Sequence, residues 1–114
     1  MNDVRLQLTE LFEKIAVKIE GGDWTQGTLE WEGKRCALGH LMYSDELVEN
    51  YDVAVQCLRE ATGLPGDFVD PHMATIPYFN DKEIHTKEEA AAWFRRAKRQ
   101  ASMIKEDQIG RAHV

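Results

Sequence analysis

The sequence predicts a mainly α-helical protein: a single-domain bundle of about four helices, with a small β-hairpin between the first and second helices. Three observations support this fold class. Apolar residues recur at helical spacing in two long segments. Both segments carry start or stop signals of helices. Between the two segments, a glycine turn separates two short stretches of alternating character, which is typical of a hairpin. A chain of 114 residues, 43% of them apolar, has the size of one domain with one core.

The first predicted helix has one continuous apolar face. Asn2 or Asp3 can cap its start, because a short side-chain oxygen satisfies a free backbone N–H there. Gly21 and Gly22 end it, since glycine adopts the left-handed conformation at little cost. The apolar face consists of Val4, Leu8, Leu11, Phe12, Ile15 and Ile19.

The predicted hairpin pairs residues 28–31 with residues 34–37 across a turn formed by Glu32 and Gly33. An isolated hairpin is marginally stable in water, so we expect it to pack on helices.

A short helix is predicted directly after the hairpin, from Cys36 to Tyr43. Its interior contains Gly39, which costs about 1 kcal/mol relative to alanine in a helix. We therefore expect Gly39 to permit a close approach by another backbone.

The third predicted helix begins at Asp52 as its N-cap and runs through Ala61. Gly63 stands where a helix-ending glycine belongs, with Pro65 behind it. Residues 66–85 contain Pro71 and Pro77 and are predicted to be irregular, with room for one short helical turn.

The last predicted helix has the clearest start signal. Thr86 and Glu89 form a capping box, in which each side chain satisfies the other residue's free backbone donor. The domain is expected to span residues 1–105, and the polar residues 106–114 are expected to fray. The buried face of this helix is predicted to be Ala90, Trp93, Phe94, Ala97, Ala101 and Ile104.

Composition restricts the cellular setting and the partners. The net charge of −6 argues against a nucleic-acid partner held by overall charge. No apolar run approaches the length of a membrane span, and no secretory signal is visible, so we expect a cytoplasmic protein away from membranes. In that compartment Cys36 and Cys57 are expected to be free thiols. Oligomeric state is left open by the sequence.

Four short motifs give the chain a resemblance to a known family. They are Trp24-Thr25-Gln26-Gly27, Cys36-Ala37-Leu38-Gly39, the pair Asn80-Asp81, and Thr86-x-x-Glu89. Over residues 5–103 their order and spacing resemble an uncharacterised family of small proteins from actinobacteria and their phages. The chain departs from that family's common form at His40 and at Tyr78-Phe79. The resemblance implies a fold and a biological setting, and no activity.

Cys36 is the leading candidate for chemistry. It follows Lys34 and Arg35 at a predicted helix start, and such positive surroundings lower the pKa of a thiol. His40, one turn on, is a candidate base, which Asn80 or Asp81 would orient. The alternative, which we favour, is that Cys36 behaves as a small buried hydrophobe.

No cofactor is predicted from the sequence. A zinc site built from Cys36, His40, Cys57 and either His72 or His85 would lack the paired ligand spacing of known zinc motifs, so no metal site is predicted.

Two further groups are candidate binding residues. Trp24, Gln26, Asn80 and Asp81 are predicted to meet in loops at one end of the helices, where binding sites often lie. Alternatively, these polar side chains satisfy backbone groups in turns. On the last helix, Arg95, Arg96, Lys98 and Arg99 form a predicted basic face, with Arg95 and Arg99 as binding candidates for nucleic acid, a phosphate group or an acidic partner. The alternative, which we favour, is that this face is simply solvated.

Three functions remain open at this point. The leading hypothesis is a small interaction or regulatory protein that binds a host macromolecule, with a protein as partner. The second is a hydrolase or transferase that depends on Cys36 with His40 as base. The third is a sensor that binds a small ligand beside Trp24, Gln26, Asn80 and Asp81.

Overall fold

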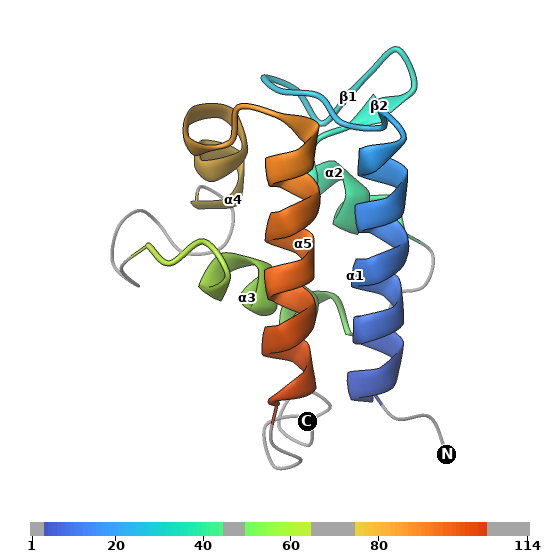
Figure 1. The fold of residues 1–114 in the computed structure, drawn as a ribbon, viewed down its shortest axis with the longest axis vertical. Helices are drawn as coiled ribbons and strands as arrows, with labels where there is room; N and C mark the ends of the chain where they lie inside the picture. The colour runs from blue at the N-terminus through green and yellow to red at the C-terminus, as the bar shows by residue number, and fades with distance from the viewer. Residues whose placement is uncertain (1–3, 45–49, 65–74, 105–114) are drawn as a thin grey trace.

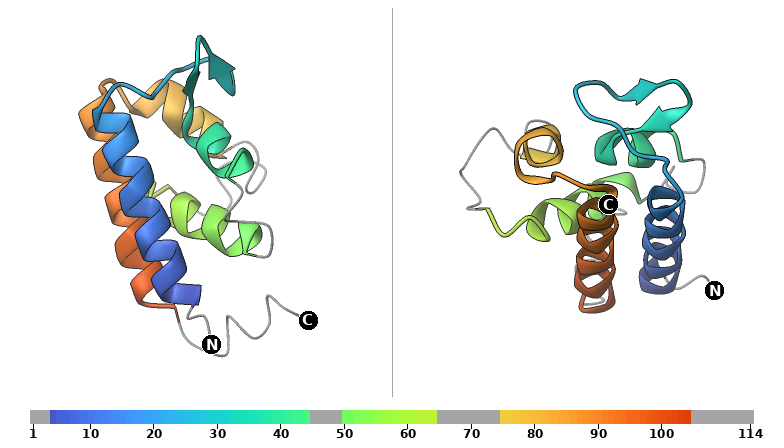
Figure 2. Two further views of the ribbon diagram at one scale, coloured as in Figure 1. Left: turned by 90° about the vertical axis from the view of Figure 1, so that its right-hand side faces the viewer. Right: turned by 45° about the horizontal axis from the view of Figure 1, so that its top comes forward.

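The fold is built on two long antiparallel helices, α1 (Val4–Glu20) and α5 (Lys87–Ser102), which lie side by side in Figures 1 and 2. The computed structural model describes residues 4–44, 50–64 and 75–104. Within this part of the chain the architecture is mainly helical, with a two-stranded antiparallel hairpin between α1 and α2, which confirms the predicted fold class. The predicted caps Asn2 and Asp3 and the predicted frayed tail 106–114 lie outside the described residues.

The core lies where the apolar faces of α1 and α5 meet. Phe12, Trp93 and Phe94 are fully buried, and the rings of Phe12 and Phe94 have their centroids 6.1 Å apart. The indole Nε1 of Trp93 donates a hydrogen bond of 2.9 Å to the carbonyl oxygen of Leu58 in α3 (Tyr51–Glu60), which holds α3 against α5. Cys57 of α3 is a core residue, and burial raises its pKa to about 12.

The hairpin is shorter than predicted. It pairs β1 (Glu30–Trp31) with β2 (Lys34–Arg35), with Glu30 opposite Arg35 and Trp31 opposite Lys34. Both turn residues, Glu32 and Gly33, have positive φ, at 50° and 80°. This is the backbone conformation that a two-residue hairpin turn requires, and it confirms the predicted turn.

Helix α2 (Ala37–Met42) follows the hairpin and packs beneath it. Cys36 is the N-cap of this helix rather than a residue of its first turn. The expectation for Gly39 is confirmed, because a Cβ at this position would overlap the carbonyl oxygen of Leu29 in the hairpin. Gly39 therefore sets how closely α2 approaches the hairpin.

Helix α3 starts two residues earlier than predicted. Its N-cap is Asn50, whose carbonyl oxygen accepts the first helical hydrogen bond from the Ala54 N–H at 3.0 Å. Asp52 therefore lies in the first turn, where the positive end of the helix dipole stabilises its carboxylate. The predicted stop signal is confirmed, since Gly63 has a φ of 75° just after the helix end.

The segment before α5 is more helical than predicted. Helix α4 (Thr75–Tyr78) continues into one π-helical turn, η2 (Phe79–Glu83), closed by a hydrogen bond of 3.1 Å from Ile84 N–H to Phe79 C=O. Pro77 does not break α4, because it stands in the first turn, where the N–H that proline lacks would have no helical partner.

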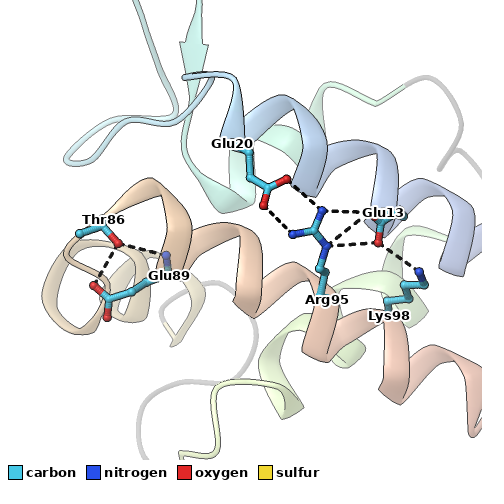
Figure 3. A network of polar contacts seen from close by, with 6 residues as sticks. All are labelled: Glu13, Glu20, Thr86, Glu89, Arg95 and Lys98. Atoms are coloured by element: carbon cyan, nitrogen blue, oxygen red, sulfur yellow. Dashed lines mark hydrogen bonds and ion pairs between the residues drawn. The ribbon is translucent and has the colours of Figure 1, made fainter.

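The capping box at the start of α5 is confirmed in one of its two bonds. The Glu89 N–H donates to Thr86 Oγ1 at 3.1 Å, as Figure 3 shows. The second bond differs from the prediction: the Glu89 carboxylate accepts from the backbone N–H of His85, at 3.2 Å, and from the Thr86 hydroxyl, at 3.3 Å.

Among the helices that the structure describes, none has the length and apolar character needed to cross a bilayer.

Candidate functional site

Asn80 lies at the centre of a polar cluster that joins the loop after α1, the start of α2 and the turn η2. Its side chain is completely buried, at 0% exposure. Its Oδ1 accepts hydrogen bonds from the indole Nε1 of Trp24, at 2.8 Å, and from the backbone N–H of Ala37, at 3.1 Å. Its Nδ2 donates to the carbonyl oxygen of Thr25 and to Asp81 Oδ1, both at 3.0 Å. Every hydrogen-bonding position of this buried amide is used.

Gln26 and Asp81 complete the cluster from opposite sides. The Nε2 group of Gln26 donates to the carbonyl oxygens of Asn80 and Ile84, each at 2.9 Å. In return, Asp81 Oδ1 accepts from the backbone N–H of Gly27 at 3.0 Å. The side chain of each segment thus satisfies the backbone of the other. We call Trp24, Gln26, Asn80 and Asp81 the Asn80 cluster.

The structure brings together all four loop residues that the sequence singled out. Their hydrogen bonds run to one another and to nearby backbone groups. These contacts match the alternative interpretation, in which the polar side chains satisfy backbone groups. The bonds join two segments that lie about 55 residues apart in the sequence. A ligand site beside these residues stays a prediction that this geometry does not favour, since the Asn80 amide and the Trp24 indole N–H already have partners within the protein.

Asp23 is a structural residue that the sequence analysis missed. Its carboxylate oxygen Oδ1 accepts from the Arg35 N–H at 2.9 Å, which fixes the second strand of the hairpin. Its carbonyl oxygen accepts a hydrogen bond of 2.7 Å from His40 Nε2. The signal available in the sequence was an aspartate directly after the Gly21-Gly22 helix stop, a position where Asp side chains bond to nearby backbone.

Cys36 is buried, with 4% of its surface exposed, and caps α2 through its sulfur, which accepts from the Gly39 N–H at 3.4 Å. The expected lowering of its pKa is wrong. Burial raises the pKa of the Cys36 thiol, because desolvation disfavours the thiolate more than the hydrogen bonds to its sulfur favour it. A thiol in this state is a weak nucleophile at neutral pH.

His40 is also buried, at 3% exposure, and its ring meets Phe94 edge-on, with centroids 6.2 Å apart. Burial lowers the pKa of His40, so the neutral ring is favoured, with Nε2–H donating to the Asp23 carbonyl oxygen. Among the described residues, no histidine nitrogen hydrogen-bonds to the Cys36 sulfur. The catalytic pairing of Cys36 with His40 therefore stays a prediction that this geometry does not favour.

The predicted basic face of α5 is divided between two neighbours. Arg95 points toward α1, where its guanidinium bonds Glu13 at 2.9 Å and Glu20 at 2.7 Å, and Lys98 bonds Glu13 at 3.1 Å (Figure 3). Hydrogen bonds from Arg95, and then from Lys98, lower the pKa of Glu13 from its usual 4.5 to about 2. Arg95 is thus occupied within the protein and is poorly placed to receive an external acidic partner.

Arg96 and Arg99 lie toward α3 instead. The Nε of Arg96 donates to the carbonyl oxygen of Ala61, at 3.1 Å, just after the end of α3. Arg99 is exposed. Both line an open groove of about 620 Å³ between the end of α3 and the last turns of α5.

The comparison with known families is decisive for classification. A model of a family of unknown function, DUF6197, matches residues 4–100 of the chain. The chain belongs to this family. Neither a curated protein nor a solved structure matches it. The matched range is close to the residues 5–103 over which the sequence resemblance was found.

The motifs behind that resemblance have a structural explanation in this DUF6197 protein. Trp24 and Gln26 of the first motif contact the Asn80-Asp81 pair, and the second motif supplies the backbone N–H of Ala37 to the same amide. Three of the four motifs therefore meet at the Asn80 cluster, and the fourth is the capping box of α5. The motifs build the junction between the hairpin and the helices.

Proposed function

We propose that this protein is a small interaction protein, which binds a protein partner through the outer face of its hairpin. The observation that carries this proposal is Trp31, whose side chain is 61% exposed on a hairpin that the Asn80 cluster holds firmly in place. Tryptophan is strongly enriched among the residues that dominate binding energy in protein interfaces.

The strand register decides which way Trp31 faces. Side chains alternate between the two faces of a strand, so Trp31 and Lys34 share one face and Glu30 and Arg35 share the other. Arg35 lies on the inner side, with its guanidinium 5.1 Å from the ring centroid of Tyr43, which follows α2. Trp31 and Lys34 therefore face solvent, away from the helices.

The hairpin is held in one orientation before any partner arrives. Its base is fixed by a hydrogen bond of 3.1 Å from Cys36 N–H to Leu29 C=O and by the bond from Arg35 N–H to Asp23. The loop leading into it is fixed by Gln26 and by the bond from Gly27 N–H to Asp81. Such preorganisation reduces the entropy that binding would otherwise cost.

The chemistry of the hairpin defines the partner. The partner should have an apolar pocket deep enough to bind the indole of Trp31. A carboxylate on the rim of that pocket would pair with Lys34, which lies beside Trp31. In the setting implied by the sequence resemblance, a phage-encoded or actinobacterial accessory protein in the cytoplasm, the partner is a host protein whose activity is modulated.

The test compares two exposed apolar residues at distant positions. The full chain is used as bait in an actinobacterial lysate, alongside Trp31→Ala and Leu6→Ala; Leu6 is 56% exposed on α1, far from the hairpin. We expect a stoichiometric protein that binds the parent chain and the L6A variant. With the purified partner, W31A should weaken binding about 30-fold or more, as hot-spot tryptophans do. Equal binding by W31A and the parent chain would refute the proposal.

The enzyme hypothesis has less support. It requires an accessible thiolate, whereas the Cys36 sulfur is buried and its pKa is raised. Alkylation of the folded protein, followed by mass spectrometry across a pH series, tests this directly. We expect both thiols to resist until the protein unfolds, and rapid modification of Cys36 near neutral pH would restore the enzyme hypothesis.

A further inference from the structure

The groove between the end of α3 and the last turns of α5 contains two arginines that no carboxylate neutralises among the described residues. Arg95 and Lys98, on the same helix, are paired with Glu13 and Glu20 of α1. Arg96 has the bond from Nε to the Ala61 carbonyl oxygen, and its two terminal nitrogens have no partner in the described part of the chain. The Arg99 guanidinium likewise has no described partner.

The two guanidinium groups lie close enough to affect each other. Burial lowers the pKa of Arg96, and the charge of Arg99 lowers it further. Within the described residues no carboxylate pairs with either group, so the two like charges repel each other and a bound anion would relieve the repulsion. The bond to Ala61 also fixes the direction of the Arg96 fork, so little side-chain entropy remains to be lost on binding.

One acidic residue also lines the groove, and its contacts matter for the argument. The Glu60 carboxylate accepts a hydrogen bond of 3.1 Å from Gln56, one turn earlier on α3. Within the described residues, no ion pair joins Glu60 to either arginine. Among the described residues that line the groove, the two arginines therefore outnumber the single carboxylate and form no ion pair with it.

We propose that this groove binds a small phosphate monoester. A phosphate monoester carries a charge of about −1.5 to −2 at pH 7, which matches two guanidinium groups, and its oxygens suit their planar forks. The groove volume of about 620 Å³ is in the range of small-molecule sites. Met103 and Ala61, which line the groove, offer apolar contacts to the organic part of the ligand.

The experiment is a titration of the full chain with phenyl phosphate at pH 7, followed through the Nε–Hε NMR signals of the arginine side chains. We expect saturable shifts for Arg96 and Arg99. Arg99→Gln should weaken binding about tenfold or more, the value of a charged hydrogen bond. The control is Lys87→Gln, which removes the same charge from an exposed residue at the other end of α5 and should change the affinity less than twofold.

Three results would overturn the proposal. The first is the absence of saturable shifts at Arg96 and Arg99. The second is an equal loss of affinity in R99Q and K87Q, which would indicate unspecific attraction by net charge. The third is tighter binding of a phosphoserine peptide than of phenyl phosphate, which would assign the groove to phosphorylated proteins. The Trp31→Ala variant should titrate like the parent chain, so this proposal and the proposed interaction through the hairpin stand or fall separately.

Discussion

The Asn80 cluster and the ion pairs of Arg95 both join parts of the chain that are far apart in sequence, but by different physical means. The cluster connects positions 24–27 with positions 80–84 through a fully buried, uncharged amide. The ion pairs connect α1 with α5 across 82 residues through charged groups at the surface. Side chains of Arg95 and Glu13 are 33% and 37% exposed.

Burial decides how much each connection contributes to stability. A hydrogen-bonding group left unpaired in the interior keeps its full desolvation cost, whereas a broken surface ion pair regains water on both sides. The buried, uncharged amide of Asn80 should therefore contribute more to stability than the ion pairs at the surface. Three measurements can confirm or break this comparison.

The largest effect is expected at Asn80. Asn80→Ala removes the acceptor of the Trp24 indole N–H and the Ala37 N–H, and the donor to the Thr25 carbonyl. Loss of several buried hydrogen bonds should lower the free energy of unfolding by about 3–5 kcal/mol, as urea denaturation measures it.

Asn50 provides a matched control for that substitution. It is a buried asparagine, 7% exposed, and its Oδ1 has no hydrogen-bond partner among the described residues. Asn50→Ala should change the free energy of unfolding by less than about 1 kcal/mol, because its Oδ1 accepts no hydrogen bond within the described residues. If N80A and N50A lowered the free energy of unfolding by similar amounts, the hydrogen bonds of the Asn80 cluster would contribute no particular stability.

A smaller effect is expected from the protonation of His40. Since burial lowers the pKa of His40 below 6.5, the unfolded chain binds the proton more readily than the folded protein. The stability contributed by the neutral ring is complete above pH 6.5 and falls as the pH decreases below it. The slope is at most about 1.4 kcal/mol per pH unit for one group.

The surroundings of His40 have mixed charge. The Asp23 carbonyl oxygen and carboxylate favour its protonated form, whereas Arg35 and Lys18 oppose it. Unfolding measured between pH 7 and pH 5 should show the slope in the parent chain and lose it in His40→Gln. Substitution of the exposed His85 by Gln should leave the slope in place. A slope that survives in H40Q would contradict the assignment.

The smallest effect is expected from the surface ion pairs. Arg95→Met should lower the free energy of unfolding by about 1 kcal/mol or less at low salt, and by almost nothing in 1 M NaCl. Glu13 gives the same contribution a pH dependence: with its pKa lowered to about 2, the stabilisation is present above pH 4.5 and lost between pH 4.5 and 2. A loss that is insensitive to salt and exceeds that of N80A would reverse the comparison.

Local signals in the sequence were sufficient for much of the fold. The glycine stop after α1, the turn at Glu32-Gly33 and the cap at Thr86 each depend on residues within a few positions of one another. The second bond of the capping box differs from the prediction, because the neighbouring backbone N–H of His85 is a competing donor. The helical segment 75–83 was missed, because a proline in the first turn does not break a helix.

The site was less predictable because its geometry depends on tertiary contacts. The sequence grouped Trp24, Gln26, Asn80 and Asp81 correctly but could not determine whether they would bond a ligand or each other. It also treated Arg95 and Arg96 as one basic face. Only the packing of α1 on α5 shows that one arginine meets carboxylates and the other meets a groove.

The pairing of α1 with α5 has a consequence for how the protein is made. During translation at about 5–20 residues per second, the 82 residues between Glu13 and Arg95 take roughly 4–16 s to synthesise. Throughout that time, the apolar face of α1, including Phe12, leaves the ribosome without the helix that will cover it. The hairpin that carries Trp31 therefore gains its anchor to the Asn80 cluster only after Asp81 has emerged from the ribosome.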